Sequence, residues 1–161
     1  MKKSVVFHDG ELSAGAIRQQ REAVRNIEKF AKYHVGITLR PYQAEVAEAI
    51  VKSVFKRDGK TFVIIFSRQS GKDELLAIIF FFLMERFREL GVEMVSVQPT
   101  FKPQTINAME RLRKRATYKE KKMSRTAGYI MRLGEARLSY FSGEPSANQV
   151  GATADGLLVI N

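Results

Sequence analysis

The sequence contains no cysteine and only two histidines, His8 and His34. The absence of cysteine excludes disulfide bridges and thiolate metal sites, and two histidines are too few to build a zinc site by themselves. Neither histidine lies in a nucleophile context, so the sequence offers no Ser-His-Asp or Cys-His arrangement for covalent catalysis. The chemistry of this chain has to come from other residue types.

Long apolar runs are also missing. The most apolar stretch is residues 75–84 (LLAIIFFFLM), and charged residues follow it at once. Such a stretch is too short to cross a hydrocarbon layer of about 30 Å as a helix, so it predicts a buried helix. Residues 1–10 carry two lysines but no apolar run of the secretory type. We therefore expect no membrane association.

Positive charge is unevenly distributed along the 161 residues. Residues 111–137 hold ten lysines and arginines against two glutamates, which is +8 of the formal net charge of +10. Concentrated positive charge attracts polyanions, and nucleic acid is the commonest of these. A solvated loop and helix face would give the same pattern, and the sequence leaves both interpretations open.

The order of predicted elements indicates an α/β domain. Apolar periodicity and turn residues predict helices, short β-branched runs predict strands, and Gly134-Glu135 predicts a hairpin turn. This pattern is typical of a mostly parallel sheet with helices on both faces. The predicted helices are 13–34, 41–54, 72–90 and 104–115, and the predicted strands are 60–66, 92–97, 129–133, 137–141 and 156–161, the last of them buried.

The segment most informative about chemistry is residues 66–74 (FSRQSGKDE), which follows a predicted strand and opens a predicted helix. The first amides of a helix lack internal partners and carry a partial positive charge. Gly71 lets the backbone approach a phosphate closely, and Lys72 supplies a flexible cation. Ser67, Gln69 and Ser70 would add backbone amides. The segment therefore predicts a phosphate-binding loop.

The match to the general phosphate-loop pattern, G-x-x-x-x-G-K-[ST], is incomplete. Phe66 occupies the first glycine position, and Asp73 occupies the hydroxyl position that normally ligates Mg²⁺. A carboxylate can ligate Mg²⁺ directly, but it also adds negative charge beside the phosphates. The alternative is an ordinary strand-to-helix turn with an incidental Gly-Lys pair.

Three stretches together resemble the N-terminal ATPase domain of phage terminase large subunits. SRQSGK followed by an acidic residue and Glu-Leu-Leu is similar to that family's deviant phosphate loop. Residues 39–43 (LRPYQ) resemble its adenine-recognition motif, and residues 151–161 (GATADGLLVIN) resemble the approach to its Walker B strand. The resemblance covers residues 37–161, which we expect to form a partial P-loop ATPase domain. Residues 1–36 would be an N-terminal helical segment.

The resemblance implies a role for each matching residue. Gln43 would bind adenine, Lys72 would hold the β and γ phosphates of ATP, and Arg68 would stabilise charge at the γ-phosphate. Asp73 and Asn161 would lie nearest to Mg²⁺, although Asn161 stands where the family has an aspartate. The glutamate that polarises the attacking water would come after Asn161. Hydrolysis by this chain is therefore left open.

The function implied by the resemblance is an ATP-driven viral DNA-packaging motor. Double-stranded DNA would contact the basic residues 111–137, and the family's other partners are the terminase small subunit and the portal protein. A homo-oligomeric ring in the cytoplasm of a bacterial host is expected. A helicase-like translocase lobe would share the glutamine and the phosphate loop. A truncated module that binds nucleic acid or a partner without hydrolysis is the third interpretation.

Overall fold

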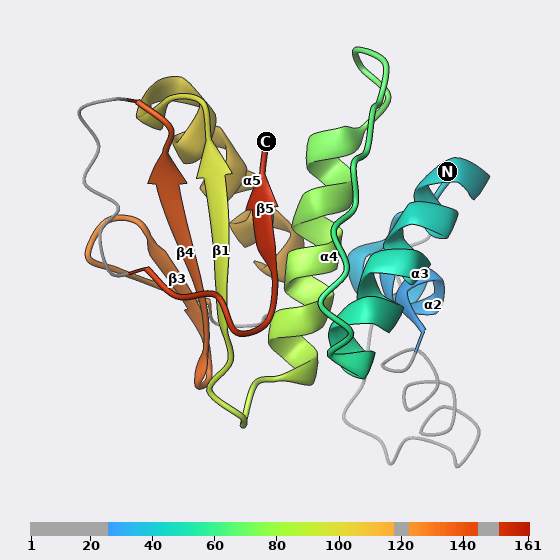
Figure 1. Ribbon diagram of the computed structural model, residues 1–161, viewed down its shortest axis with the longest axis horizontal. Coiled ribbons are helices and arrows are strands. Elements are labelled where there is room, and N and C mark those ends of the chain that lie inside the picture. The colour runs from blue at the N-terminus through green and yellow to red at the C-terminus, as the bar shows by residue number, and fades with distance from the viewer. Residues whose placement is uncertain (1–25, 118–122, 145–151) are drawn as a thin grey trace, which may run out of the picture.

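The computed structural model describes residues 26–117, 123–144 and 152–161 (Figure 1). Helices occupy its first half and most of its strands follow. In chain order the elements are α2 (Ile27–Phe30), the π-helical turn η1 (Ala31–Val35), α3 (Pro41–Lys56), α4 (Lys72–Arg86), β1 (Glu93–Gln98), the irregular turn η2 (Phe101–Thr105), α5 (Ile106–Thr117), β2 (Ser124–Thr126), β3 (Ile130–Leu133), β4 (Ala136–Ser142) and β5 (Leu158–Ile160).

The strands form one sheet in the order β2-β3-β4-β1-β5. The central strand β1 pairs in parallel with β4 on one side and with β5 on the other. β3 pairs antiparallel with both β2 and β4, and Gly134 at the β3–β4 turn has a φ of 60°. The predicted α/β class, parallel centre and hairpin are confirmed. The short strand β2 was not predicted, because its residues are polar and exposed.

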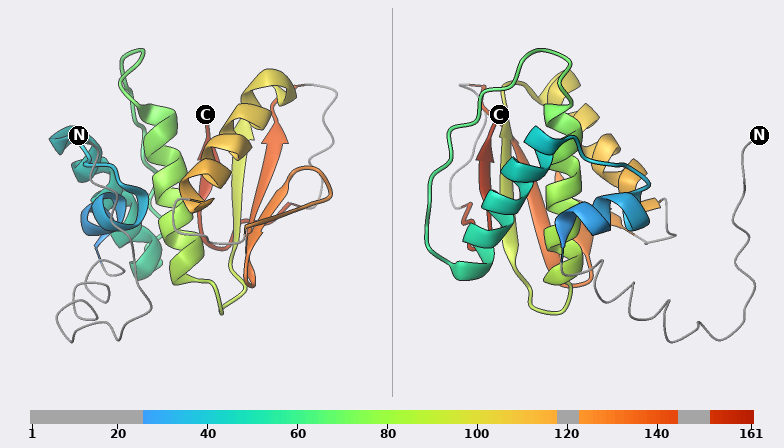
Figure 2. Two further views of the ribbon diagram at one scale, coloured as in Figure 1. Left: turned by 180° about the vertical axis from the view of Figure 1, so that it is seen from behind. Right: turned by 90° about the vertical axis from the view of Figure 1, so that its right-hand side faces the viewer.

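Helices α4 and α5 lie on one side of the sheet, and α3 packs against α4 (Figure 2). On that side Met94, Leu138 and Tyr140 are buried against them. On the opposite side, at the β5 edge, the Leu158 and Ile160 side chains are 54% and 78% exposed. The prediction of helices on both faces is wrong for this part of the chain, and so is the prediction that the last strand is buried, because nothing described covers that face.

Helix α4 is the centre of the hydrophobic core. Its residues from Leu75 to Met84 are almost all buried, so it is apolar on nearly every side. The Phe30 ring packs edge-on against Phe81 and Phe82, at centroid distances of 5.1 and 5.2 Å. The α2 and η1 turns therefore belong to the same core as α4. The part of the predicted first helix before residue 26 lies outside the described residues.

Residues 60–66, which we call the 60–66 segment, are extended but form no strand. Val63 and Ile65 are 87% and 91% exposed, while Ile64 and Phe66 pack against the helical core. The predicted strand is wrong because a strand needs a neighbour to complete its hydrogen bonds. The nearest sheet edge, β5, is separated from this segment by a groove. In Figure 1 the segment runs alongside α4 and α3.

None of the helices in the described residues is long and apolar enough to cross a membrane. Helix α4, which contains the most apolar stretch of the sequence, instead packs against α3, α5 and the sheet. Its apolar surface is therefore accounted for by contacts inside the protein.

Candidate functional site

Residues 67–71 form a tight turn between the 60–66 segment and α4. Ser70 donates to the carbonyl oxygen of Ser67 twice, from its amide at 3.3 Å and from its hydroxyl at 2.7 Å. Gln69 and Gly71 both have left-handed backbone conformations, with φ of 60° and 83°. Alternating backbone conformations of this kind turn successive amide groups toward one concave side.

The turn leaves the N-terminus of α4 open. Gly71 occupies the N-cap position, where no side chain caps the helix, and the first helical hydrogen bond runs from the Leu75 amide to the Gly71 carbonyl oxygen at 2.9 Å. Within the described residues, the amides of Lys72, Asp73 and Glu74 therefore have no acceptor. Unpaired amides at the positive end of a 15-residue helix form a site for an anion.

Hydrogen bonds from Gln43 connect this turn to helix α3. Its Oε1 accepts from the Arg40 amide at 3.0 Å, and its Nε2 donates to the Ser70 carbonyl oxygen at 3.0 Å. The Tyr42 hydroxyl donates to the same oxygen at 2.8 Å. A Cβ at Gly71 would lie 2.7 Å from Gln43 Nε2 and would displace that side chain, and the φ of 83° also favours glycine there. Two motifs 27 residues apart in the sequence thus form one structural unit.

A small cavity of about 190 Å³ opens beside this unit. Its walls come from the chain before α3, from Gln43, and from the turn at Gln69, Ser70 and Gly71. Gln43 lines this cavity, and its Nε2 has one hydrogen beyond the one that it donates to Ser70. The structure therefore places the glutamine predicted to bind a base within a cavity that adjoins the helix N-terminus.

Asp73 and Asn161 come together on the other side of the α4 start. Asn161 Nδ2 donates to Asp73 Oδ1 at 3.3 Å and to Gln98 Oε1 at 2.8 Å. Gln98 is buried and donates in turn to Ser96 Oγ at 2.9 Å. The carboxyl ends of β1 and β5 therefore meet the first turn of α4, which is where ligands bind in open α/β sheets.

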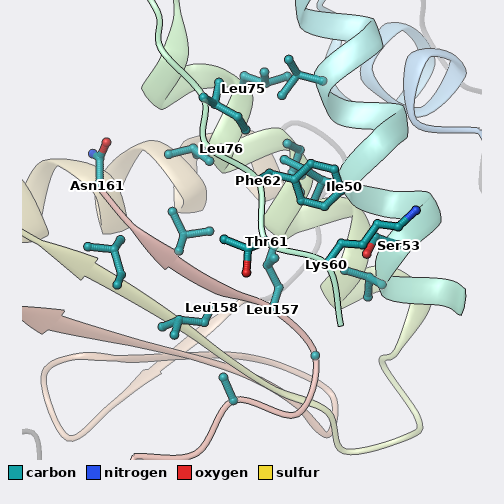
Figure 3. A pocket seen from close by; sticks show the side chains of 18 of the residues that line it. Ile50, Ser53, Lys60, Thr61, Phe62, Leu75, Leu76, Leu157, Leu158 and Asn161 are labelled. Atoms are coloured by element: carbon teal, nitrogen blue, oxygen red, sulfur yellow. The ribbon is translucent and has the colours of Figure 1, made fainter. Parts of the chain in front are cut away.

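Two further residues of the predicted site lie apart from these contacts. Arg68 is exposed on the turn. Lys72 is half-buried and lines a larger groove of about 960 Å³ between the 60–66 segment and β5. Figure 3 shows this groove, with Ile50 and Phe62 along one side, Leu157 and Leu158 along the other, and Asn161 at one end. Lys72 and Asn161 thus connect the apolar groove to the helix N-terminus.

Helix α5 adds two arginines that sequence reasoning did not place in the site. Arg115 bonds through Nε to Glu74 Oε1, and Arg111 Nε lies 3.7 Å from Glu74 Oε2. Arg111 Nη1 also lies 3.9 Å from Asp73 Oδ2. The signal was present in the sequence, because arginines four residues apart share one helix face and could meet the adjacent Asp73 and Glu74.

The basic residues 111–137 are less available than their number suggests. Arg111 and Arg115 face the acidic start of α4, and Arg137 Nη1 pairs with Glu93 Oε1 at 3.0 Å. Arg113 and Lys114 are exposed on α5. Lys119, Lys121 and Lys122 lie outside the described residues. The positive surface that the structure describes is therefore the exposed side of α5 together with Arg125 of β2, whose guanidinium donates to the Gly128 carbonyl oxygen, rather than the whole segment.

The residues present favour a phosphate chain over a protein-held metal. Three unpaired amides and the neighbouring Lys72 suit an anion. No group of three or more histidine, aspartate or glutamate side chains in the described parts of the chain could hold a metal ion. Asp73 would be the ligand for Mg²⁺, which is commonly held by one or two carboxylates together with substrate phosphates. Asn161 presents its nitrogen to Asp73.

No family model matches this chain, and neither the curated proteins nor the solved structures give a match. The functional interpretation therefore depends on the site itself: an open helix N-terminus, an adjacent lysine, a glutamine-lined cavity, and a carboxylate and an amide at the carboxyl ends of two strands.

Proposed function

We propose that this chain binds ATP through residues 67–72 and forms the nucleotide-binding core of a viral DNA-packaging motor, as a P-loop ATPase of the terminase large subunit type. The β and γ phosphates lie against the free amides of Lys72, Asp73 and Glu74, with the Lys72 ammonium beside them. The adenine base enters the cavity lined by Gln43. Asp73 holds Mg²⁺ when it accompanies the nucleotide.

The observation that supports this proposal most strongly is the junction of the turn with α4. Two left-handed residues, Gln69 and Gly71, precede a helix whose first amides are unpaired and whose first residue is Lys72. A plain strand-to-helix turn has no need of a glycine held against a buried glutamine. The approach of Gln43 to Ser70 links a base-binding residue to a phosphate-binding turn, which is the arrangement that a nucleotide requires.

DNA translocation is the second part of the proposal. Duplex DNA contacts the exposed cations of α5, including Arg113 and Lys114, through its phosphates and without reading its sequence.

For hydrolysis, Arg68 is exposed on the turn and is the residue that would reach the γ-phosphate as charge develops there. The small subunit and portal protein of the terminase family are the further partners proposed.

Calorimetric titration of ATP tests the nucleotide site directly. Lys72→Ala should weaken ATP binding at least about tenfold, because it removes a charge-assisted hydrogen bond to phosphate. Lys52, which is exposed on α3, provides the matched control, and Lys52→Ala should bind ATP as the parent chain does. Absence of ATP binding at millimolar concentration, or equal binding by Lys72→Ala, would refute the nucleotide site.

The same samples also test the DNA proposal. Arg113→Gln combined with Lys114→Gln should weaken binding of a DNA duplex and reduce its dependence on salt, because fewer counterions are released on binding. ATP binding should be unchanged in this double variant, since neither side chain touches the turn. Unaltered DNA binding would show that α5 is not part of the DNA-contact surface, and it would not affect the proposal of the nucleotide site.

A further inference from the structure

Arg111 is held near the α4 start by charge alone. Its guanidinium lies 3.9 Å from Asp73 Oδ2 and 3.7 Å from Glu74 Oε2. Both distances are longer than a hydrogen bond, and among the described residues Arg111 makes no hydrogen bond at all. A guanidinium has five N–H donors, which need acceptors when the group is partly buried. Its donors are therefore available to a ligand.

Arg115 on the same face of α5 provides an internal contrast. Its Nε donates a hydrogen bond to Glu74 Oε1, and its side chain is the less exposed of the two, at 24% against 35% for Arg111. Arg115 thus gives Glu74 a hydrogen bond that Arg111 does not supply. Arg111, one helical turn earlier, adds only the longer ion pairs with Asp73 and Glu74 to the packing of α5 on α4.

The surroundings of Arg111 place it at the phosphate end of the proposed nucleotide site. Asp73 follows Lys72 in the first turn of α4, and its other carboxylate oxygen accepts from Asn161. Tyr140 of β4 lies close enough that the Arg111 charge opposes the effect of burial, which raises the pKa of the Tyr140 phenol. Arg111 therefore projects between the start of α4 and the carboxyl end of the sheet.

The charge of Asp73 explains why a cation is needed here. A carboxylate at the position usually held by a hydroxyl repels a triphosphate when no Mg²⁺ neutralises it, and Lys72 is the one cationic side chain in the first turn of α4, beside Asp73 and Glu74. Building on the nucleotide site proposed above, we propose that Arg111 is a phosphate-binding residue, which offsets Asp73 and donates hydrogen bonds to the terminal phosphate of a nucleoside triphosphate. It thereby makes the site prefer a triphosphate to a diphosphate.

Titration of ATP and ADP into the parent chain, Arg111→Gln and Arg115→Gln tests this role. Arg111→Gln should lower ATP affinity about tenfold or more, the loss expected for hydrogen bonds to a charged group, and leave ADP affinity nearly unchanged. Arg111→Lys should recover part of the ATP affinity, because lysine keeps the positive charge. The recovery should be incomplete, because lysine lacks the paired donors with which a guanidinium binds phosphate. Arg115→Gln should lower the melting temperature without changing the ratio of ATP to ADP affinity.

The ratio of ATP affinity to ADP affinity distinguishes a phosphate-binding role of Arg111 from a purely structural one. If Arg111→Gln lowers the affinities for ATP and ADP equally, or lowers neither, Arg111 does not bind the terminal phosphate. The proposal of a nucleotide site is not affected by that result. If the parent chain binds neither nucleotide, both proposals are wrong. An unchanged melting temperature in Arg111→Gln with a collapsed ATP preference supports the assignment most directly.

Discussion

The 60–66 segment (KTFVIIF) and strand β4 (ARLSYFS) are both extended and both seven residues long, but only β4 belongs to the sheet. Both contain apolar and aromatic side chains. β4 lies between β1 and β3 and alternates buried and half-buried residues along its length. The 60–66 segment pairs with no described strand. A strand-like sequence thus predicts an extended backbone, but pairing depends on a neighbour at the right distance.

The two segments also differ in which side chains are covered. Along β4 the side facing the helices is fully buried, as at Leu138 and Tyr140. In the 60–66 segment Ile64 and Phe66 pack against the helices, whereas Val63 and Ile65 point to solvent. Continuous apolar character predicts burial on both sides. Here only one side is covered, and the other contributes exposed apolar surface next to the groove.

Truncating one apolar side chain in each segment should give the largest difference between them. Leu138→Ala removes a side chain with no exposed surface and should lower the free energy of unfolding by about 2–5 kcal/mol. Ile65→Ala removes a side chain that is 91% exposed, and its effect should stay within about 0.5 kcal/mol. Urea denaturation of both variants measures these changes.

The pair of variants also shows whether the 60–66 segment is covered in solution. A loss of several kcal/mol in Ile65→Ala would mean that this side chain is buried by a contact outside the described residues. The contrast with β4 would then disappear. Equal, small effects in both variants would instead contradict the core position of Leu138.

A smaller difference is expected between the glycines that follow and precede the 60–66 segment. Gly71 and Gly59 both have positive φ, at 83° and 64°. Alanine in that conformation costs about 1–2 kcal/mol, so Gly59→Ala should lose about that amount, because no atom lies within 4 Å of its added Cβ. Gly71→Ala should lose roughly 1 kcal/mol more, since the Cβ would displace Gln43 from Ser70.

Thermal or urea unfolding gives the stability of these two variants, and ATP titration gives their binding. Only Gly71→Ala should lose ATP affinity, because its Cβ disturbs the turn that presents the amides. If Gly59→Ala reduces ATP binding to the same extent, the path of the 60–66 segment matters more than the local geometry at Gly71.

Much of the fold could be predicted from local pattern. Helices α3, α4 and α5, strand β1 and the β3–β4 hairpin follow from apolar periodicity, from Pro41 and from turn residues. The 60–66 segment could not be placed, because pairing is a property of two segments and the sequence shows them one at a time. Strand β2 is exposed throughout and has no apolar alternation to reveal it.

The candidate site was predictable only where its residues are adjacent in the sequence. Residues 67–72 form a continuous motif, and the structure gives them the left-handed turn and open helix start that the motif requires. The contact between Gln43 and Ser70 was not predicted, because it depends on how α3 packs beside the turn. The sequence shows Arg111 only as part of a basic run, because its position beside Asp73 depends on how α5 packs on α4.

The smallest expected effect concerns the carboxyl groups that flank the two segments. Glu144 follows β4, and its pKa is lowered first by the Ser142 hydroxyl, which donates to Oε2 at 2.6 Å, and then by the Phe101 amide at 3.1 Å. Asp58 precedes the 60–66 segment, and its pKa is lowered by the Ser53 hydroxyl and by Lys60. Each hydrogen bond favours the ionised carboxylate.

A lowered pKa in the folded state stabilises the protein above the ordinary pKa of the carboxyl group, and this contribution is lost as the pH falls through the lowered value. Ser142→Ala should therefore raise the pKa of Glu144 and leave that of Asp58 unchanged, and Ser53→Ala should do the reverse. Side-chain carboxyl titration by NMR measures both.

Because Glu144 joins the end of β4 to η2, Ser142→Ala should also increase amide exchange at Phe101 in acid. If Phe101 exchanges equally fast in the parent chain, Glu144 does not fix the end of β4, and β4 is held by its strand neighbours alone.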